Sequence, residues 1–172
     1  MDHSHGAGIT DWAGGAMNGW DKVPGTSTLD DNLAYKQYHE DDIPNYWAYA
    51  RTFTLADHFF SQMIGPSFPG HLAVLAAQAG WAVGNPDTNP YGLGFRLPLI
   101  IISPYAKPGF IFREVAEHAS IPRFIERIMG STQTLSDLDP AAQDGQANDL
   151  MNAFDFTQQP LPPLVLQTRR CL

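Results

Sequence analysis

The chain has 172 residues, which suits a single domain, and 44% of them are hydrophobic and 12% aromatic, so it can bury a sizeable core. A formal net charge of −8 with no basic patch argues against nucleic acid as a partner, because an acidic surface repels phosphate backbones. No run approaches the ~20 apolar residues of a membrane-spanning helix, and the first residues show no signal-peptide pattern. We expect a soluble chain, and its one cysteine excludes an internal disulfide.

Residues 1–30 are rich in Gly, Asp, Ser and Thr, which predicts loops around one or two short elements. His3 and His5 are one residue apart and would face the same side of an extended segment. With Asp2 beside them they can bind a metal or a phosphate. A mobile chain terminus explains the same residues, and local sequence leaves both interpretations open.

The next elements are a helix and an apolar segment. Ile43, Tyr46, Trp47 and Ala50 recur at helical spacing, and Pro44 suits a first turn, so a helix is predicted to end near Arg51. The preceding acidic residues 41 and 42 are expected to cap it. Residues 53–60 then form an apolar segment whose length fits a buried strand or a short helix.

A serine follows in a turn rich in proline and glycine. Ser67 lies between Pro66 and residues 68–69, where each proline fixes its own φ and restricts the residue before it. Such a rigid turn presents a hydroxyl with little conformational entropy left to lose, so Ser67 is a candidate nucleophile; an ordinary loop serine is the alternative. A helix is predicted over 72–79, starting just past Ser67, where unpaired N–H groups favour an anion. A long irregular connection is expected over 81–94.

The clearest strand lies within 96–104, where a nearly continuous apolar run predicts a central parallel strand buried on both faces. A helix is predicted over 117–129, with its apolar residues on one face. His118 therefore lies near a helix N-terminus beyond the carboxyl end of a strand, a position where open α/β sheets bind ligands. A packing histidine is the alternative. We expect one α/β domain over 1–160 and an extended, proline-rich tail over 161–172.

Several blocks of this sequence resemble a bacterial phosphoesterase family that includes the phosphatidylcholine-type phospholipases C and acid phosphatase A. Their joint order is more specific than any one of them. The blocks are 2–5 (Asp-His-Ser-His), 12–20, 43–50, 55–60, 65–71 (Gly-Pro-Ser-Phe-Pro-Gly-His), 98–106, 117–121 and 148–156.

The resemblance implies an alkaline-phosphatase-like α/β fold, a mainly parallel sheet flanked by helices, here truncated. It implies attack on phosphorus by a serine hydroxyl next to a divalent metal, on a small-molecule or lipid ester, in a secreted or periplasmic setting. Ser67 matches the nucleophile position, and His118 with His3 or His5 matches the phosphate-site histidines. Our candidate catalytic residues are Ser67, His118 and His71, and our candidate substrate-binding residues are His3, His5, Asp57 and His58.

The sequence departs from the family pattern at the metal. The early Glu-Asn pair and a later Asp-rich block of the family are not found, and Arg113 stands where a second family histidine is expected. The resemblance therefore makes a divalent metal possible while its usual ligands are missing. Three interpretations remain open. The chain can bind a metal through other ligands, among Asp2, His3, His5, Asp57 and His58. It can instead be a serine hydrolase without a metal, including a carboxylesterase, in which Asp57 or Glu117 is the acid, or it can be a scaffold without activity. Because a shortened sheet leaves unpaired edges, we also expect a homo-oligomer.

Overall fold

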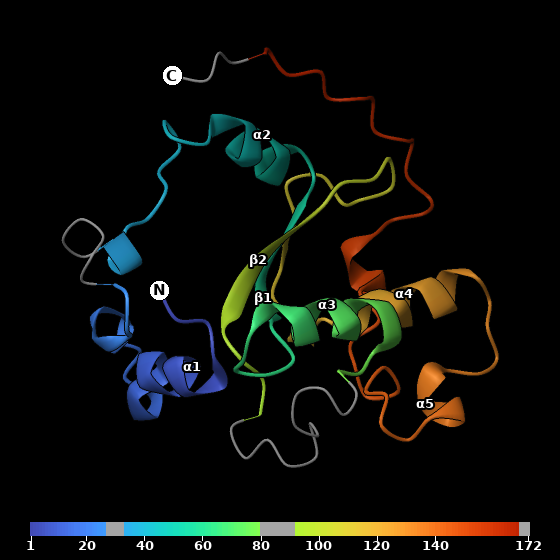
Figure 1. Ribbon diagram of the computed structural model, residues 1–172. Coiled ribbons are helices and arrows are strands. Elements are labelled where there is room, and N and C mark those ends of the chain that lie inside the picture. Colours follow the sequence, from blue (N-terminus) through green and yellow to red (C-terminus); the bar gives the residue numbers. More distant parts are fainter. Residues whose placement is uncertain (27–32, 80–91, 169–172) are drawn as a thin grey trace.

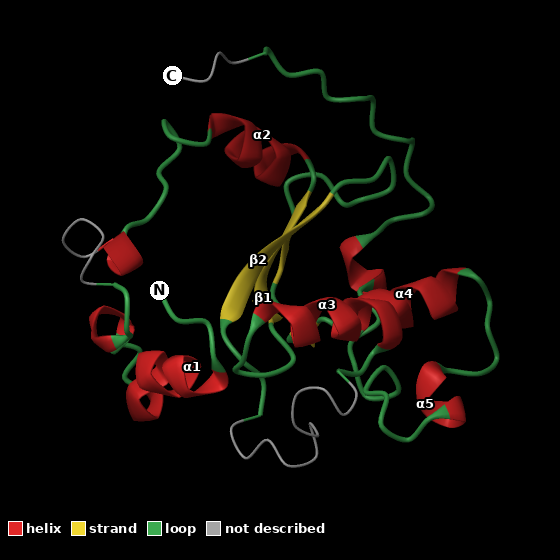
Figure 2. Cartoon of the chain, in the orientation of Figure 1, coloured by secondary structure: helices red, strands yellow, loops and turns green. Residues whose placement is uncertain are grey.

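A computed structural model describes residues 1–26, 33–79 and 92–168. A small twisted sheet lies at the centre, with helices at its two ends and along one side (Figures 1 and 2). The mixed α/β class with helices flanking the sheet is therefore confirmed. The expected connection falls mostly on residues outside the described ranges, as does the lone cysteine, and the domain boundary at residue 160 stays a prediction.

The sheet is built around β1 (Thr54–Phe60), which resolves the choice between strand and helix for this apolar segment. Strand β2 (Arg96–Ile101) pairs with it antiparallel. The two-residue strands β3 (Ile111–Phe112) and β4 (Ala116–Glu117) pair with it in parallel, one at each half of its length. Among the described strands, two of the three pairings with β1 are thus parallel.

The strand predicted within 96–104 exists, but its predicted position is wrong. It is an edge strand, antiparallel to β1, and its Arg96 and Pro98 are exposed. Only its alternate residues Leu97, Leu99 and Ile101 pack against the core. Pro98 fits this edge position, because it lacks the N–H that a strand in the centre of a sheet needs for its ladder of hydrogen bonds.

The helices differ in how closely they follow the predictions. The α-helices are α1 (His5–Trp12), α2 (Pro44–Thr52), α3 (Ser67–Ala76), α4 (Ser120–Ile128) and α5 (Leu135–Leu138), and short 3-10 turns occur at Ala13–Gly15, Trp20–Lys22, Leu33–Tyr35 and Met151–Ala153. Helix α2 has the predicted proline in its first turn, but its N-cap is Ile43 and no side chain caps it. Asp42 instead accepts a hydrogen bond from the backbone N–H of His39 at 2.9 Å.

The main core lies between the sheet and α4. Ala56, Phe59 and Phe112 are buried there, and Ile121 and Phe124 of α4 pack on them. A second cluster joins the end of α3 to the residue before α4, through Ala77 and Ala119. These contacts place the end of α3 beside the start of α4. The C-terminal end of β1 pairs with β4, which leads into α4, and the chain from this same end of β1 leads into α3. No helix of the described residues is long and apolar enough to cross a membrane.

Candidate active site

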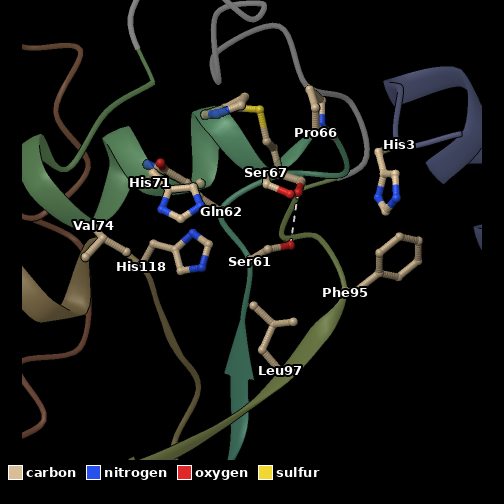
Figure 3. Close-up of a pocket in the computed structure, with 14 residues that line it drawn as sticks. His3, Ser61, Gln62, Pro66, Ser67, His71, Val74, Phe95, Leu97 and His118 are labelled. Carbon is tan, nitrogen blue, oxygen red and sulfur yellow. Dashed lines mark hydrogen bonds between the residues drawn. The ribbon is translucent and has the colours of Figure 1, made fainter.

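A cavity of about 460 Å³ opens at this end of β1 (Figure 3). Its walls come from four segments that are far apart in the sequence: the N-terminal residues, the turn into α3, the start of β2 and the residue between β4 and α4. The lining residues are His3, Ser61, Gln62, Met63, Gly65, Pro66, Ser67, Pro69, Gly70, His71, Val74, Phe95, Leu97 and His118.

Ser67 is the first residue of α3 and faces the cavity in an exposed position. The predicted helix therefore begins five residues earlier than expected and includes the serine turn. Pro66 is its extended N-cap, and no side chain caps the helix. The backbone N–H groups of Ser67 and Phe68 have no acceptor within the helix, and Pro69 has no N–H. The helix thus offers two N–H groups and the positive end of its dipole beside the hydroxyl.

His118 reaches the cavity from the junction of β4 and α4, half-buried. Its ring packs on Gly70: a Cβ built on that glycine would lie 3.0 Å from Cε1 of the imidazole. The Phe59 ring lies 5.7 Å away, centroid to centroid, at 55°. Within the part of the chain that the structure describes, Nδ1 of His118 is buried and has no hydrogen-bond partner. Burial, and secondarily the neighbouring His71, lower the pKa of His118.

His71 lies one helical turn after Ser67, so its side chain shares a face of α3 with the hydroxyl. Figure 3 shows the rings of His71 and His118 next to each other, with Ser67 between this pair and His3 in that view. His3 belongs to the N-terminal segment, which the Asp2 N–H joins to the Pro24 carbonyl at 2.9 Å. Imidazoles on three separate segments thus line one cavity with a serine hydroxyl.

Comparison with known proteins identifies the family. The sequence profile of the phosphoesterase family matches residues 1–89 and 80–131, which is more than half of the chain. The chain belongs to the phosphoesterase family. The non-hemolytic phospholipase C of Pseudomonas aeruginosa is 36% identical over 78 residues, 44% of this chain and 11% of that protein. The hemolytic phospholipase C of the same organism is 42% identical over 67 residues, which is 39% of this chain and 9% of that protein. Phospholipase C A of Mycobacterium tuberculosis is 28% identical over 104 residues, which is 60% of this chain and 19% of that protein.

This member of the phosphoesterase family aligns with less than a fifth of the length of these relatives. The family assignment confirms the resemblance read from the ordered blocks of the sequence.

Three of the predicted site residues of this phosphoesterase-family chain lie outside the cavity. The ring of His5 makes a short hydrogen bond with the Ile64 carbonyl, which fastens α1 to the turn before α3. Asp57 lines a different cavity, of about 240 Å³, and its carboxylate is 4.0 Å from the guanidinium of Arg113. His58 is exposed, with Nδ1 2.9 Å from the Arg113 carbonyl.

Two polar lining residues were missed by the sequence analysis, Ser61 and Gln62. The Ser61 hydroxyl donates to the Met63 carbonyl at 3.0 Å, and the Gln62 amide donates to the Ala77 carbonyl at 3.1 Å. Both directly follow β1, and that position could have pointed to them, since ligands bind beyond the carboxyl ends of strands in open α/β sheets. The Gln62 Oε1 atom is buried with no partner among the described residues.

The residues of the cavity do not fit the divalent metal that the family resemblance implies. Within residues 1–26, 33–79 and 92–168, no three His, Cys, Asp or Glu side chains are grouped to hold an ion. Among the residues that the structure describes, no carboxylate lines the cavity, whereas hard divalent cations prefer oxygen ligands. We therefore assign no role in the site to a metal.

Proposed function

We propose that the cavity hydrolyses phosphoric esters with Ser67 as the nucleophile. The observation that supports this best is the joint position of the Ser67 hydroxyl, a helix N-terminus and three imidazoles on one cavity. The two unpaired N–H groups and any protonated imidazole supply donors where negative charge develops on the phosphoryl oxygens. His71 and His3, both more exposed than His118, suit this charge-stabilising role.

The proton transfers fall to the imidazoles. The Ser67 hydroxyl is a weak nucleophile unless a base takes its proton as the oxygen attacks phosphorus. His118 suits the base, because its lowered pKa keeps the ring neutral near pH 7. An imidazolium, His71 or His3, donates a proton to the departing alcohol oxygen, leaving phosphoserine. Water then attacks phosphorus and gives its proton to the imidazole that protonated the alcohol, while His118 returns its proton to the Ser67 oxygen. The serine hydroxyl is thereby restored, and phosphate, or a phosphomonoester from a diester, is released.

The relatives, which are phospholipases C, and the apolar part of the cavity support a lipid ester as the substrate class. Phe95, Leu97 and Val74 line the cavity beside the polar groups. These walls suit the apolar portion of a lipid ester, with its phosphate against α3.

The test compares p-nitrophenyl phosphate, its phosphorylcholine diester and p-nitrophenyl butyrate as substrates, with and without a chelator. Ser67→Ala should lower phosphoester turnover by about 10³-fold or more, because the nucleophile is lost. His118→Gln should lower it by about 10²-fold through loss of the base. Ser131→Ala and His39→Gln, exposed and away from the cavity, are the matched controls.

Two outcomes contradict the proposal. Turnover of butyrate alone would indicate a carboxylesterase, although His118 Nδ1 lacks the acid partner of a serine triad within the described residues. Unchanged phosphoester turnover in Ser67→Ala would indicate a scaffold with a contaminating activity. The chelator arm measures separately whether residues beyond the cavity supply a metal.

A further inference from the structure

A third cavity, of about 230 Å³, lies between α2 and the sheet at the opposite end of β1 from Ser67. We name it the aromatic groove. Tyr38, Tyr46 and Trp47 line one side, and Pro98 and Ile100 of the edge strand β2 line the other. Tyr38 is 75% exposed and Tyr46 62%, and no residue of α2 is buried. This face of α2 therefore carries rigid apolar surface that the described residues leave largely uncovered.

The C-terminal tail leaves the domain beside the end of β2. The Leu161 N–H donates to the Pro104 carbonyl at 2.8 Å, and the Gln158 side chain donates to the carbonyls of Pro104 and Ala106 at 3.0 Å. Beyond this anchor, residues 162–168 form no helix or strand, and Val165 is 88% exposed. Figure 1 shows the red tail arching over the end of the molecule that carries α2.

The chemistry of the tail matches that of the groove. Residues 160–166 read Pro-Leu-Pro-Pro-Leu-Val-Leu, a sequence that favours the polyproline II helix. Grooves lined by Tyr and Trp side chains recognise such segments, because the helix is preformed and loses little entropy on binding. Tyr38, Tyr46 and Trp47 supply this kind of surface.

Charge and reach agree with this match. Glu40 is already paired with Arg51, but Asp41 and Asp42 also precede α2, and the sequence after Thr168 continues with Arg169 and Arg170. Five residues of polyproline II span roughly 15 Å, so the segment up to Leu166 can run from its anchor at Pro104 back along β2, a strand of about 20 Å. Because the tail is tethered next to the groove, its effective concentration is in the millimolar range, above that of a second molecule in dilute solution.

We propose that residues 162–168 dock into the aromatic groove of the same molecule, with Leu164 and Leu166 against α2 and β2. Compared with the tail in Figure 1, docking requires a bend at the residues that follow Leu161. The proposal concerns the end of the molecule away from the serine, so it stands independently of the phosphoesterase activity.

The test uses the full chain and its one cysteine, Cys171, as the attachment point of a nitroxide spin label. Indole N–H signals of a ¹⁵N-labelled sample report on the tryptophans, and Trp47→Phe assigns the signal in the groove. Docking should broaden the Trp47 signal much more than those of Trp12 and Trp20. The double substitution Leu164→Asp with Leu166→Asp should abolish this difference, whereas the control Gln167→Asp with Thr168→Asp, of equal charge, should retain it.

Several results would overturn the proposal. If Trp47 is broadened no more than Trp12, the tail does not dock. If it is broadened equally in both double variants, proximity comes from the tether alone. Broadening between molecules, seen when spin-labelled and ¹⁵N-labelled chains are mixed, would assign the groove to a second copy. A Trp47 signal that responds to phosphatidylcholine vesicles but not to the spin label would indicate that the aromatic groove binds lipid.

Discussion

Gly70 gives His118 its place at the cavity. The imidazole lies where a side chain at residue 70 would begin, with Cε1 3.0 Å and Nδ1 3.5 Å from a Cβ built there. Gly70→Ala should therefore displace the ring by a few tenths of an ångström or rotate it. We predict a loss of about 10- to 100-fold in kcat on phosphoesters, since small misplacements of a catalytic group are costly, with a thermal midpoint close to that of the wild type.

The matched control is Gly6→Ala in α1, where the added Cβ would lie 3.9 Å from the Ser4 hydroxyl, an ordinary contact. Steady-state kinetics and thermal melts of both variants separate a misplaced ring from a damaged fold. Full activity in Gly70→Ala would show that the position of His118 does not limit turnover.

At the scale of elements, β4 holds a buried carboxyl group. Burial raises the pKa of Glu117 from 4.5 to about 7, and its Oε2 atom has no partner among the described residues. As the pH rises, Glu117 therefore loses its proton at a lower pH in the unfolded chain than in the folded chain. The group lowers the free energy of unfolding progressively between pH 4.5 and about 7, and the full penalty of roughly 3 kcal/mol is present above that range.

Glu117→Gln should remove this pH dependence, because an amide does not ionise. We predict that urea unfolding will show little difference between the variant and the wild type at pH 4, and a variant more stable by about 3 kcal/mol at pH 8. Glu114→Gln, an exposed carboxylate on the same segment, is the control. Equal slopes against pH in Glu117→Gln and wild type would contradict the buried, uncharged state.

The elements also show how far sequence reasoning reaches. The helix over Pro44–Thr52 and the strand Arg96–Ile101 were predictable, since both depend on local periodicity. The edge position of β2 was not, because strand pairing is set by contacts across the chain. Ser67 and His118, which the sequence analysis singled out at turns, line one cavity, and their catalytic roles stay predictions. Asp57 and His58 lie outside this cavity, on the part of β1 where the β1–β2 register shifts between Ala56 and Phe59, an irregularity that local sequence does not reveal.

For the whole molecule, the open edge of β2 predicts self-association. Among the described strands β2 pairs only with β1, so its outer backbone groups can pair with another chain. We predict a dimer or larger species in sedimentation velocity at micromolar concentration. Ile102→Lys, immediately after β2 and 56% exposed, should shift it to monomer, because an edge lysine opposes pairing.

Ile128→Lys on α4 is the control, since that side chain is similarly exposed at 50% but lies away from the edge. A sharp monomer for the wild-type chain would contradict the prediction. If Ile102→Lys and Ile128→Lys dissociate the oligomer equally, the subunits contact each other somewhere other than the edge of β2.

The walls of the serine cavity come from residues as distant as His3 and His118. No contiguous fragment shorter than residues 3–118 contains all of them, so the cavity exists only while the N-terminal segment, α3 and the α4 junction are held together. A ligand that occupies it must consequently draw the folding equilibrium toward the native state by mass action, by about 2.7 kcal/mol at one hundred times its dissociation constant. Resistance to proteolysis in the presence of inorganic phosphate would then report occupancy of the cavity even in a variant that cannot turn over any substrate.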